Sequence, residues 1–396
     1  MKNEVYASGK IILTTHSFAP NNDGVANVNK YLCLGLAKRG YKIVVVTHKN
    51  GNQKELDHYE GVEVHRVYEP SVPEQYVNYI LGQIGKNDVL INVCTQTPTT
   101  DLLLRELRSI RCKKKILYVH GIWHFGWTNR DKESFRNCCS KVYNNFKWWQ
   151  YYRRNGKYFK QYDVVTQLHE MDEGALFFKK NYGIRSEIVE NAADDAFFEK
   201  SDDSAFLNKY QLPSSYLVCV ANYSSHKNQE MVLRAYFKSC ANAPLVFVGN
   251  GNEQYLEHLK AVEAELAKEQ KDDRSRKKVL YFRHTPRGEI ACFVRNARVF
   301  LFGSIGEKFP VSIVEAMAAR VPFVSTDVGV VKYLPGGIVV DINDYGAMAT
   351  AIDRLLDDGM LWEKLSSEGA QYARKRMRIQ EKVDQLAEII ELKCKG

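Results

Sequence analysis

The sequence lacks any long uncharged apolar stretch. Apolar residues make up 45% of the 396 positions, yet no segment supplies the ~18 consecutive apolar residues that a membrane span needs. The opening residues, MKNEVYASGKIILTTHSF, have neither the apolar run nor the small-residue cleavage site of a secretory signal. We therefore expect no segment that crosses a bilayer, and we expect a cytoplasmic protein.

Clusters of metal ligands are also missing from the sequence. The nine cysteines are scattered from Cys33 to Cys394, with no C-x-x-C pair and no Cys/His cluster of the kind that holds zinc. We expect reduced thiols that are mostly buried.

Short β-branched runs alternate with helical patterns along the chain, and its length suits two domains. The first half contains the runs KIILTT, KIVVV, VEVHRV, DVLINV, KKILYVH and DVVTQ, with helical stretches such as 100–108 and 172–181. The pattern restarts after Asp194 with YLVCV, PLVFV, KVLYF, RVFLF, PFVST and GGIVVD, and with helices at 229–239, 253–270 and 310–320. Such alternation predicts two α/β domains, each a doubly wound parallel sheet.

The predicted domain boundaries follow from this restart. We expect one Rossmann-like domain over 1–196 and a second over 197–375, with 197–215 as the connection. Two amphipathic helices are expected over 361–395, and the last of them, 376–396, is expected to pack back on the first domain. Ligands bind beyond the carboxyl ends of the strands in open α/β sheets. We therefore expect both sets of strand ends to face one central cleft.

Positive charge is concentrated in one region. The window 105–160 holds fifteen lysines and arginines against three acids, within a chain whose net charge is +9. A basic patch of this kind attracts nucleic acid, anionic lipid or a phosphorylated acceptor, and charge alone does not distinguish them.

The stretch GSIGEKFPVSIVEAMAARVPFVSTDV, from Gly303 to Val328, is the most informative. Glu307 and Glu315 stand in an E-x₇-E spacing, and Pro310 suits the first turn of a helix. Glu307 then lies in the loop before the helix and Glu315 inside it. Free amides near Val311 would point at a ligand together with the positive end of the helix dipole, as diphosphate sites require. An isolated E-x₇-E would more often be a surface loop and a solvated helix.

These residues, in unbroken order, resemble the signature of the retaining glycosyltransferases of family 4, which have the GT-B fold. That signature runs from a small-residue loop through E-x-F-P to EAMA and P-x-V-x-T. Weaker similarity extends over most of the chain, at THSFAPNNDGVANVNKYLCLGLAKRGYKIVVVTH, KILYVHG, VENAADDAFF and SSHKNQEMVLRAY. The resemblance implies transfer of a sugar from a nucleoside-diphosphate sugar to a glycan or lipid-linked acceptor.

The resemblance also implies roles for individual residues. Gly24 and Lys227 would contact the donor diphosphate, Glu307 the sugar hydroxyls and Glu315 the ribose hydroxyls. His120, at the end of KKILYVH, would lie near the reacting carbon, although a capping histidine is the alternative. Asn222 stands where the family has an arginine. The full set is His120 and Glu307 in catalysis, with Gly24, Asn222, Lys227, Arg283, Phe309, Pro310, Val311, Ser312 and Glu315 in donor binding.

Two residues, Arg283 and Asn191, have alternative roles. Arg283 is expected to compensate for the missing arginine or to stack on the base, and Asn191 is either a cleft residue or part of a turn.

No D-x-D motif stands at a strand end, so we expect neither a metal nor a cofactor. The leaving diphosphate gains a negative charge that Lys227 and the helix amides would stabilise. The family retains the anomeric configuration, with the donor phosphate taking the acceptor proton.

The segment from Lys141 to Lys160, KVYNNFKWWQYYRRNGKYFK, interleaves aromatic residues with cations. We rank packing on the domain core first for most of its rings. Contact of its cationic face with an anionic membrane ranks second, and stacking on single-stranded nucleic acid third.

Three functions remain open at this point. A transferase consumes both donor and acceptor, a GT-B epimerase or phosphorylase needs no separate acceptor, and a noncatalytic module binds a sugar nucleotide or a membrane surface without turnover. The Glu307 to Glu315 block together with Lys227 favours the transferase.

Overall fold

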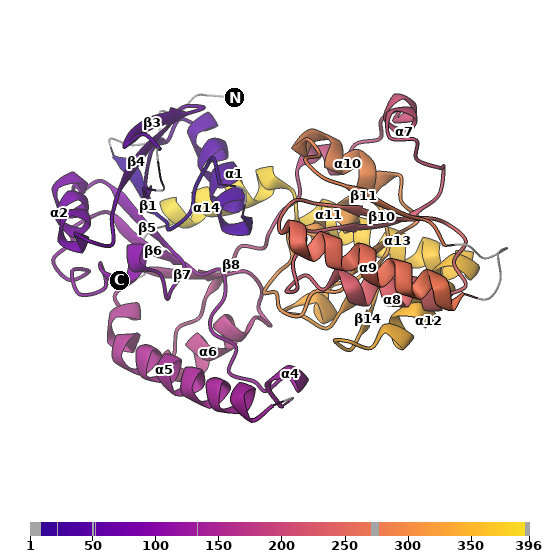
Figure 1. Cartoon of the computed structure of the whole chain (residues 1–396). Coiled ribbons are helices and arrows are strands. Elements are labelled where there is room, and N and C mark those ends of the chain that lie inside the picture. Colours follow the sequence, from indigo (N-terminus) through magenta and orange to yellow (C-terminus); the bar gives the residue numbers. More distant parts are fainter. Residues whose placement is uncertain are drawn as a thin grey trace. The chain divides into compact units, whose positions relative to one another are not determined.

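The computed structural model describes residues 9–392 apart from 22, 50, 52, 133 and 271–276 (Figure 1). The chain divides into two compact units, 1–189 with 382–396 and 190–381. In the described part, no helix is both long enough and apolar enough to cross a membrane.

The first unit is built on an eight-stranded sheet. Its strand order is β3-β4-β2-β1-β5-β6-β7-β8, and every pair is parallel except β3 with β4. The strands are β1 (Lys10–Thr14), β2 (Lys42–His48), β3 (Leu56–Tyr59), β4 (Val62–Tyr68), β5 (Val89–Val93), β6 (Lys114–Tyr118), β7 (Val164–Gln167) and β8 (Glu187–Ile188). All five residues of β5 are buried, as expected for a central parallel strand covered on both faces.

The described helices of the first unit are α1 (Gly24–Lys38), α2 (Pro73–Gln83), α3 (Pro98–Asp101), α4 (Asn129–Lys132), α5 (Phe135–Phe159), α6 (Glu173–Tyr182) and α14 (Ile379–Glu391). Six of them, α1 to α6, connect the strands of this unit, and α14 comes after the last strand of the second unit. The predicted helix over 100–108 is wrong in extent. Helix α3 ends at Asp101, and the following residues form turns with i to i+3 hydrogen bonds, such as Ser109 N to Glu106 O (2.9 Å).

The second unit has a six-stranded sheet, and all its strand pairs are parallel. The order is β11-β10-β9-β12-β13-β14. The strands are β9 (Leu217–Val220), β10 (Leu245–Val248), β11 (Val279–Phe282), β12 (Val299–Phe302), β13 (Phe323–Thr326) and β14 (Gly337–Val340). The helices are η1 (Asp195–Phe197), α7 (Ser204–Lys209), α8 (Gln229–Lys238), α9 (Glu253–Glu269), α10 (Arg287–Arg295), α11 (Val311–Ala318), η3 (Val331–Tyr333), α12 (Tyr345–Asp357) and α13 (Gly359–Arg376).

The helices of the second unit form two packed groups. Helix α8 packs on α9 and α12, while α11 packs on α10 and α13. The first group shares a buried core with the sheet, to which Phe247, Val232 and Leu259 contribute. Sequence and structure therefore agree on two doubly wound α/β domains.

The unit boundaries differ from the predicted ones. The first lies between Val189 and Glu190 rather than at 196/197. The reason is that η1 is already fixed to the second unit, because Arg295 Nη1 donates to the carbonyl of Ala196 (2.7 Å). At the other end, α14 belongs to the first unit from Lys382 onward. Lys114 Nζ donates there to the carbonyl of Ile389 (2.6 Å).

Candidate functional site

Each sheet has one point at which the strand order reverses. In the second sheet the chain runs outward from β9 to β11 on one side and from β12 to β14 on the other, so the reversal lies between β9 and β12. In the first sheet it lies between β1 and β5. Loops at the carboxyl ends of these strand pairs diverge and leave a crevice where ligands of open α/β sheets bind. The two reversal points are therefore the first places to look for a site.

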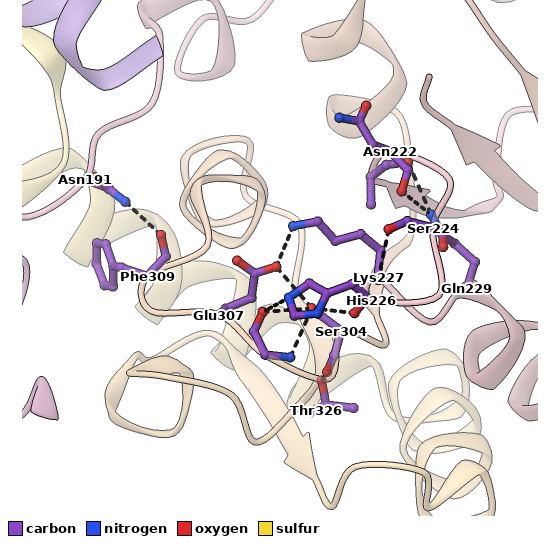
Figure 2. Close-up of polar contacts among 12 residues, drawn as sticks. Asn191, Asn222, Ser224, His226, Lys227, Gln229, Ser304, Glu307, Phe309 and Thr326 are labelled. Carbon is purple, nitrogen blue, oxygen red and sulfur yellow. Dashed lines mark hydrogen bonds and ion pairs between the residues drawn. The ribbon is translucent and has the colours of Figure 1, made fainter. Parts of the chain in front are cut away.

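Lys227 and Glu307 meet at the reversal point of the second sheet. Lys227 lies in the loop between β9 and α8, and Glu307 in the loop between β12 and α11. Lys227 Nζ donates to Glu307 Oε1 at 2.5 Å. The side chains are 29% and 17% exposed, respectively, so both are open to a ligand. Figure 2 shows the two side chains directed toward each other.

A hydrogen-bond network fixes the carboxylate of this pair. Ser304 Oγ donates to Glu307 Oε1 (3.0 Å), and Thr326 Oγ1 donates to the Ser304 carbonyl (2.6 Å). The two loops are also tied to each other, because His226 Nε2 donates to the Gly306 carbonyl (2.7 Å) and Ile305 N to the His226 carbonyl (3.0 Å) (Figure 2). The carboxylate is thus held before any ligand arrives.

Two glycines allow the backbones around this pair to approach closely. A Cβ on Gly303 would lie 2.7 Å from the Asn228 carbonyl oxygen, so the β12 loop can pass the start of α8 only without a side chain. Gly329 has φ +56°, and a Cβ there would lie 2.2 Å from the Lys308 carbonyl oxygen. Both the space and the left-handed conformation require glycine at position 329.

Helix α11 begins directly after the Glu307 loop. Pro310 is its N-cap and Val311 its first helical residue, and no acidic residue occupies the first turn. Val311 and Ser312 are half-buried. The first amides of a helix have no partner within the helix, so α11 presents donors and the positive end of its dipole on the side of Glu307. Phe309 is buried, and its carbonyl accepts from Asn191 Nδ2 (2.7 Å) (Figure 2).

Glu315 lies on the same helix, but its carboxylate is buried. It forms an ion pair with Arg287, the first residue of α10. Burial raises the pKa of Glu315, and the Arg287 guanidinium opposes that rise. Arg287 was not singled out from the sequence. The sequence signal that could have found Arg287 is its position directly after the loop that follows β11.

Asn222 and Arg283 lie apart from the Lys227–Glu307 pair. Asn222 is exposed, and its side chain is directed away from the pair (Figure 2), while Gln229 Nε2 fixes the backbone by donating to the Asn222 carbonyl (3.0 Å). Arg283 follows β11 and donates to Glu253 Oε1 (2.7 Å). The guanidinium of Arg283 is therefore already engaged with a carboxylate at the start of α9.

Gly24 stands at the reversal point of the first sheet, as the first residue of α1. Asp23 caps the helix by accepting from Ala26 N (3.0 Å) and also accepts from Ser17 Oγ. A Cβ on Gly24 would meet nothing within 4 Å. The glycine is thus not required by packing.

His120 follows β6 in the first unit. Burial, with a smaller contribution from His16, lowers the pKa of His120 to about 4, so the ring is neutral at neutral pH. Its Nε2 atom is buried and has no hydrogen-bond partner among the described residues. A capping role through that nitrogen is therefore excluded among the described residues.

The basic aromatic segment forms most of α5. Tyr152 and Phe159 are buried, so the interpretation as core holds for them. It is wrong for Tyr143, Phe146 and Trp149, which are exposed. The physical reason is that rings occur on more than one face of this helix, and only one face packs on the unit.

Metal-ligating side chains do not gather in groups of three or more anywhere in the described part, and the expectation that no metal takes part stays a prediction. Lys227, Glu307 and the start of α11, which the resemblance assigns to the donor, all lie at the reversal point of the second sheet. Ser304 and His226 were missed, although Ser304 stands three residues before Glu307 in the same strand-end loop.

Parts of the chain are similar in sequence to known glycosyltransferases. Residues 200–376 match the family of glycosyl transferases group 1. One subunit of the phosphatidylinositol N-acetylglucosaminyltransferase of Arabidopsis thaliana is 23% identical over 359 residues, which cover 84% of this chain and 70% of that protein.

Solved structures are similar over nearly the whole chain. A glycosyltransferase from Rickettsia africae has a TM-score of 0.74 at 17% identity, with 97% of this chain and 98% of that chain covered. Sucrose-phosphate synthase from Thermosynechococcus elongatus has a TM-score of 0.73 at 15% identity, covering 96% and 98%. HepE from Anabaena, in complex with UDP-glucose, has a TM-score of 0.68 at 17% identity, covering 96% and 99%. The likeness shows that the fold is GT-B.

Proposed function

We propose that this chain, whose residues 200–376 match the group 1 glycosyltransferases, is a retaining, metal-independent glycosyltransferase. It moves a sugar from a nucleoside-diphosphate sugar to a hydroxyl of a glycan or lipid-linked acceptor. The observation that carries the proposal is the Lys227–Glu307 pair (2.5 Å) beside the start of α11, at the reversal point of the second sheet.

The donor diphosphate is assigned to Lys227 and the first amides of α11. Breaking the anomeric C–O bond leaves a second negative charge on the nucleoside diphosphate, which is where the site must give most stabilisation. An ammonium has three N–H donors, so Lys227 can keep its bond to Glu307 while it donates to a phosphate oxygen. Glu307 then has its second oxygen, Oε2, for the sugar hydroxyls.

The remaining residues follow from the resemblance and belong to the proposal. Gly24 and His120 of the first unit contact the diphosphate and the sugar, respectively. Neutral His120 stabilises the positive charge on the reacting carbon without adding a repulsive charge. Glu315, held by its ion pair with Arg287, accepts from the ribose hydroxyls, and a donor phosphate oxygen takes the acceptor proton.

A uracil nucleotide is the first donor to test. Similar structures contain UDP-glucose in HepE and UDP-2-fluoro glucose in a trehalose-6-phosphate protein from E. coli. The name of the Arabidopsis relative states transfer of N-acetylglucosamine to phosphatidylinositol, which supports an acceptor at a membrane surface for this chain.

Helix α5 supports peripheral contact with an anionic membrane. Phe135, Val142, Phe146 and Trp149 recur at helical spacing and are exposed, Phe135 at 87% and Phe146 at 56%. Arg153 lies over the Trp149 ring (5.2 Å). Exposed aromatic rings beside cations suit the headgroup layer. Sedimentation with phosphatidylcholine vesicles, with and without phosphatidylserine, tests this contact, and equal binding to both would contradict it.

The test of the main proposal is a donor panel in EDTA. UDP-, GDP- and ADP-linked sugars are mixed with the protein, and thermal stability and release of free nucleoside diphosphate are measured. We expect one class of donor to stabilise the protein and to be slowly hydrolysed, and Glu307→Ala to lose the hydrolysis. Stabilisation without turnover, even with candidate acceptors, would favour the noncatalytic module, to which the exposed, uncharged Asn222 points.

A further inference from the structure

A hollow of about 710 Å³ lies on the first unit, against α5. One wall comes from Arg105, in the turns after α3, and the rest from one flank of α5. The α5 residues recur at helical spacing, as in Lys147, Tyr151, Arg154 and Tyr158. The exposed rings Phe146 and Trp149 are not among the lining residues, so the hollow and the apolar stripe are separate surfaces of one helix.

The lining of this hollow carries four cations and no acid. They are Arg105, Lys147, Arg154 and Lys157, and all four are exposed to solvent. None of them forms an ion pair with a carboxylate of the described residues, whereas Lys141 of the same helix pairs with Asp131 (3.6 Å). Four like charges around one hollow repel each other, so a bound anion lowers their energy.

Aromatic rings hold two of the four cations in place. Lys147 Nζ lies over the Trp148 ring (4.8 Å), and Lys157 Nζ over the Tyr158 ring (4.9 Å). Such contacts restrict long side chains that would otherwise sample many rotamers. The ammonium groups are therefore partly organised before an anion binds, which distinguishes the hollow from an ordinary solvated face.

The wall of the hollow is fixed to the loop that follows β5, at the reversal point of the first sheet. Tyr151 OH donates to Asp101 Oδ1 (2.5 Å) and accepts from Gln96 N (3.0 Å). Gln96 lies in the loop after β5, one of the two strands at the reversal point, and adopts φ +62°. A second bond, between Tyr152 OH and Thr95 Oγ1 (3.0 Å), joins α5 to the same loop. A ligand in the hollow thus borders the loop that shapes this edge.

We propose that the hollow binds a phosphoryl group of the acceptor. Arginine guanidinium groups, which can donate two parallel hydrogen bonds, together with compact lysine ammonium groups suit a phosphomonoester, phosphodiester or pyrophosphate. This inference rests on the proposed function, since it assigns a class of acceptor to it. The phosphoryl group belongs either to a lipid headgroup or to a soluble phosphorylated acceptor, which share this chemistry.

The test compares neighbouring arginines on two sides of α5. Arg154→Ser with Lys157→Ser removes two cations of the hollow, while Arg153→Ser removes a cation of the same helix that does not line it. All three side chains are exposed, so the variants keep the fold, which thermal unfolding verifies. The probes are inorganic pyrophosphate by calorimetry, and vesicles of phosphatidylcholine with phosphatidylinositol set against soluble glycerol 1-phosphate.

We expect the double variant to weaken pyrophosphate binding about tenfold or more, and Arg153→Ser to change it less than twofold. The same titration in a Lys227→Ala background separates the hollow from the proposed donor site, because binding at the hollow survives that change. If the double variant loses binding of the vesicles only, the phosphoryl group belongs to a lipid headgroup. If it loses binding of glycerol 1-phosphate only, the acceptor is soluble. Equal binding of pyrophosphate by the double variant and Arg153→Ser would overturn the inference. Donor hydrolysis, measured in parallel, reports on the proposed function independently.

Discussion

Replacing Lys227 by alanine is the sharpest perturbation of the donor site. The change removes the ammonium that donates to Glu307 (2.5 Å) and that we assign to the donor diphosphate. A hydrogen bond to a charged group contributes about 1.5–3 kcal/mol. Its loss corresponds to a decrease of about 10- to 150-fold in affinity for a nucleoside diphosphate.

The same change has a small effect on folding. Lys227 is 29% exposed and Glu307 17%, and an ion pair open to solvent contributes about 1 kcal/mol or less. Ser304 still donates to the Glu307 carboxylate in the variant (3.0 Å). For a unit of this size, about 1 kcal/mol lowers the melting temperature by about 2–4 °C.

The assay is calorimetric titration with UDP and UDP-glucose in EDTA, beside thermal unfolding of each protein. Lys260→Ala is the matched control, because Lys260 forms an ion pair with Glu257 (2.9 Å) on the surface of α9, away from the strand ends. We expect this control to bind as the unchanged protein does. A folded Lys227→Ala protein with unchanged affinity would refute the assignment of the diphosphate to this position.

Further predictions concern single residues of both units. Gly24→Ala places its Cβ in open space, so calorimetry and urea unfolding should show weaker donor binding with stability unchanged or raised by up to ~1 kcal/mol. Gly329→Ala, at φ +56° and 2.2 Å from the Lys308 carbonyl oxygen, should destabilise the protein by more than ~1 kcal/mol. Burial raises the pKa of Asp101 to about 6, so the folded state holds its proton more tightly than the unfolded chain. The contribution of Asp101 to the free energy of unfolding should fall by about 3 kcal/mol as pH rises from about 4 to about 6, and comparing Asp101→Asn with the unchanged protein in urea unfolding at both pH values isolates this contribution. His120, with its pKa lowered to about 4, should stay neutral down to about pH 5, and an NMR titration of its ring that shows a midpoint near 6.5 would contradict this.

Much of the fold follows from local sequence. Short β-branched runs separated by helical periodicity are enough to predict parallel sheets covered on both faces. Pro310 defines the start of α11, so the placement of Glu307 in a loop and Glu315 in a helix follows from residues a few positions apart. The extent of α3 was not predicted. Over so few residues, an α-helix and a run of turns with i to i+3 hydrogen bonds both bury apolar residues three or four positions apart, so the sequence pattern does not distinguish them.

Contacts between segments that are distant along the chain could not be predicted from the sequence. Lys227 and Glu307 are 80 residues apart, and their pairing depends on β9 and β12 being neighbours in the sheet. The burial of Glu315 against Arg287 likewise depends on how α10 packs on α11. In α5 the aromatic spacing is visible in the sequence, but rings occupy several faces, and only tertiary packing decides which of them is covered.

Hydrogen exchange with and without UDP-glucose tests the central claim most directly, because it locates the donor rather than only detecting it. The account predicts that backbone amides of the loop 221–228 and of 303–314, including the first turn of α11, become protected when the nucleotide sugar binds in EDTA. Binding that leaves both segments unprotected and protects other parts of the second unit instead would contradict the assignment of the donor to the Lys227–Glu307 site.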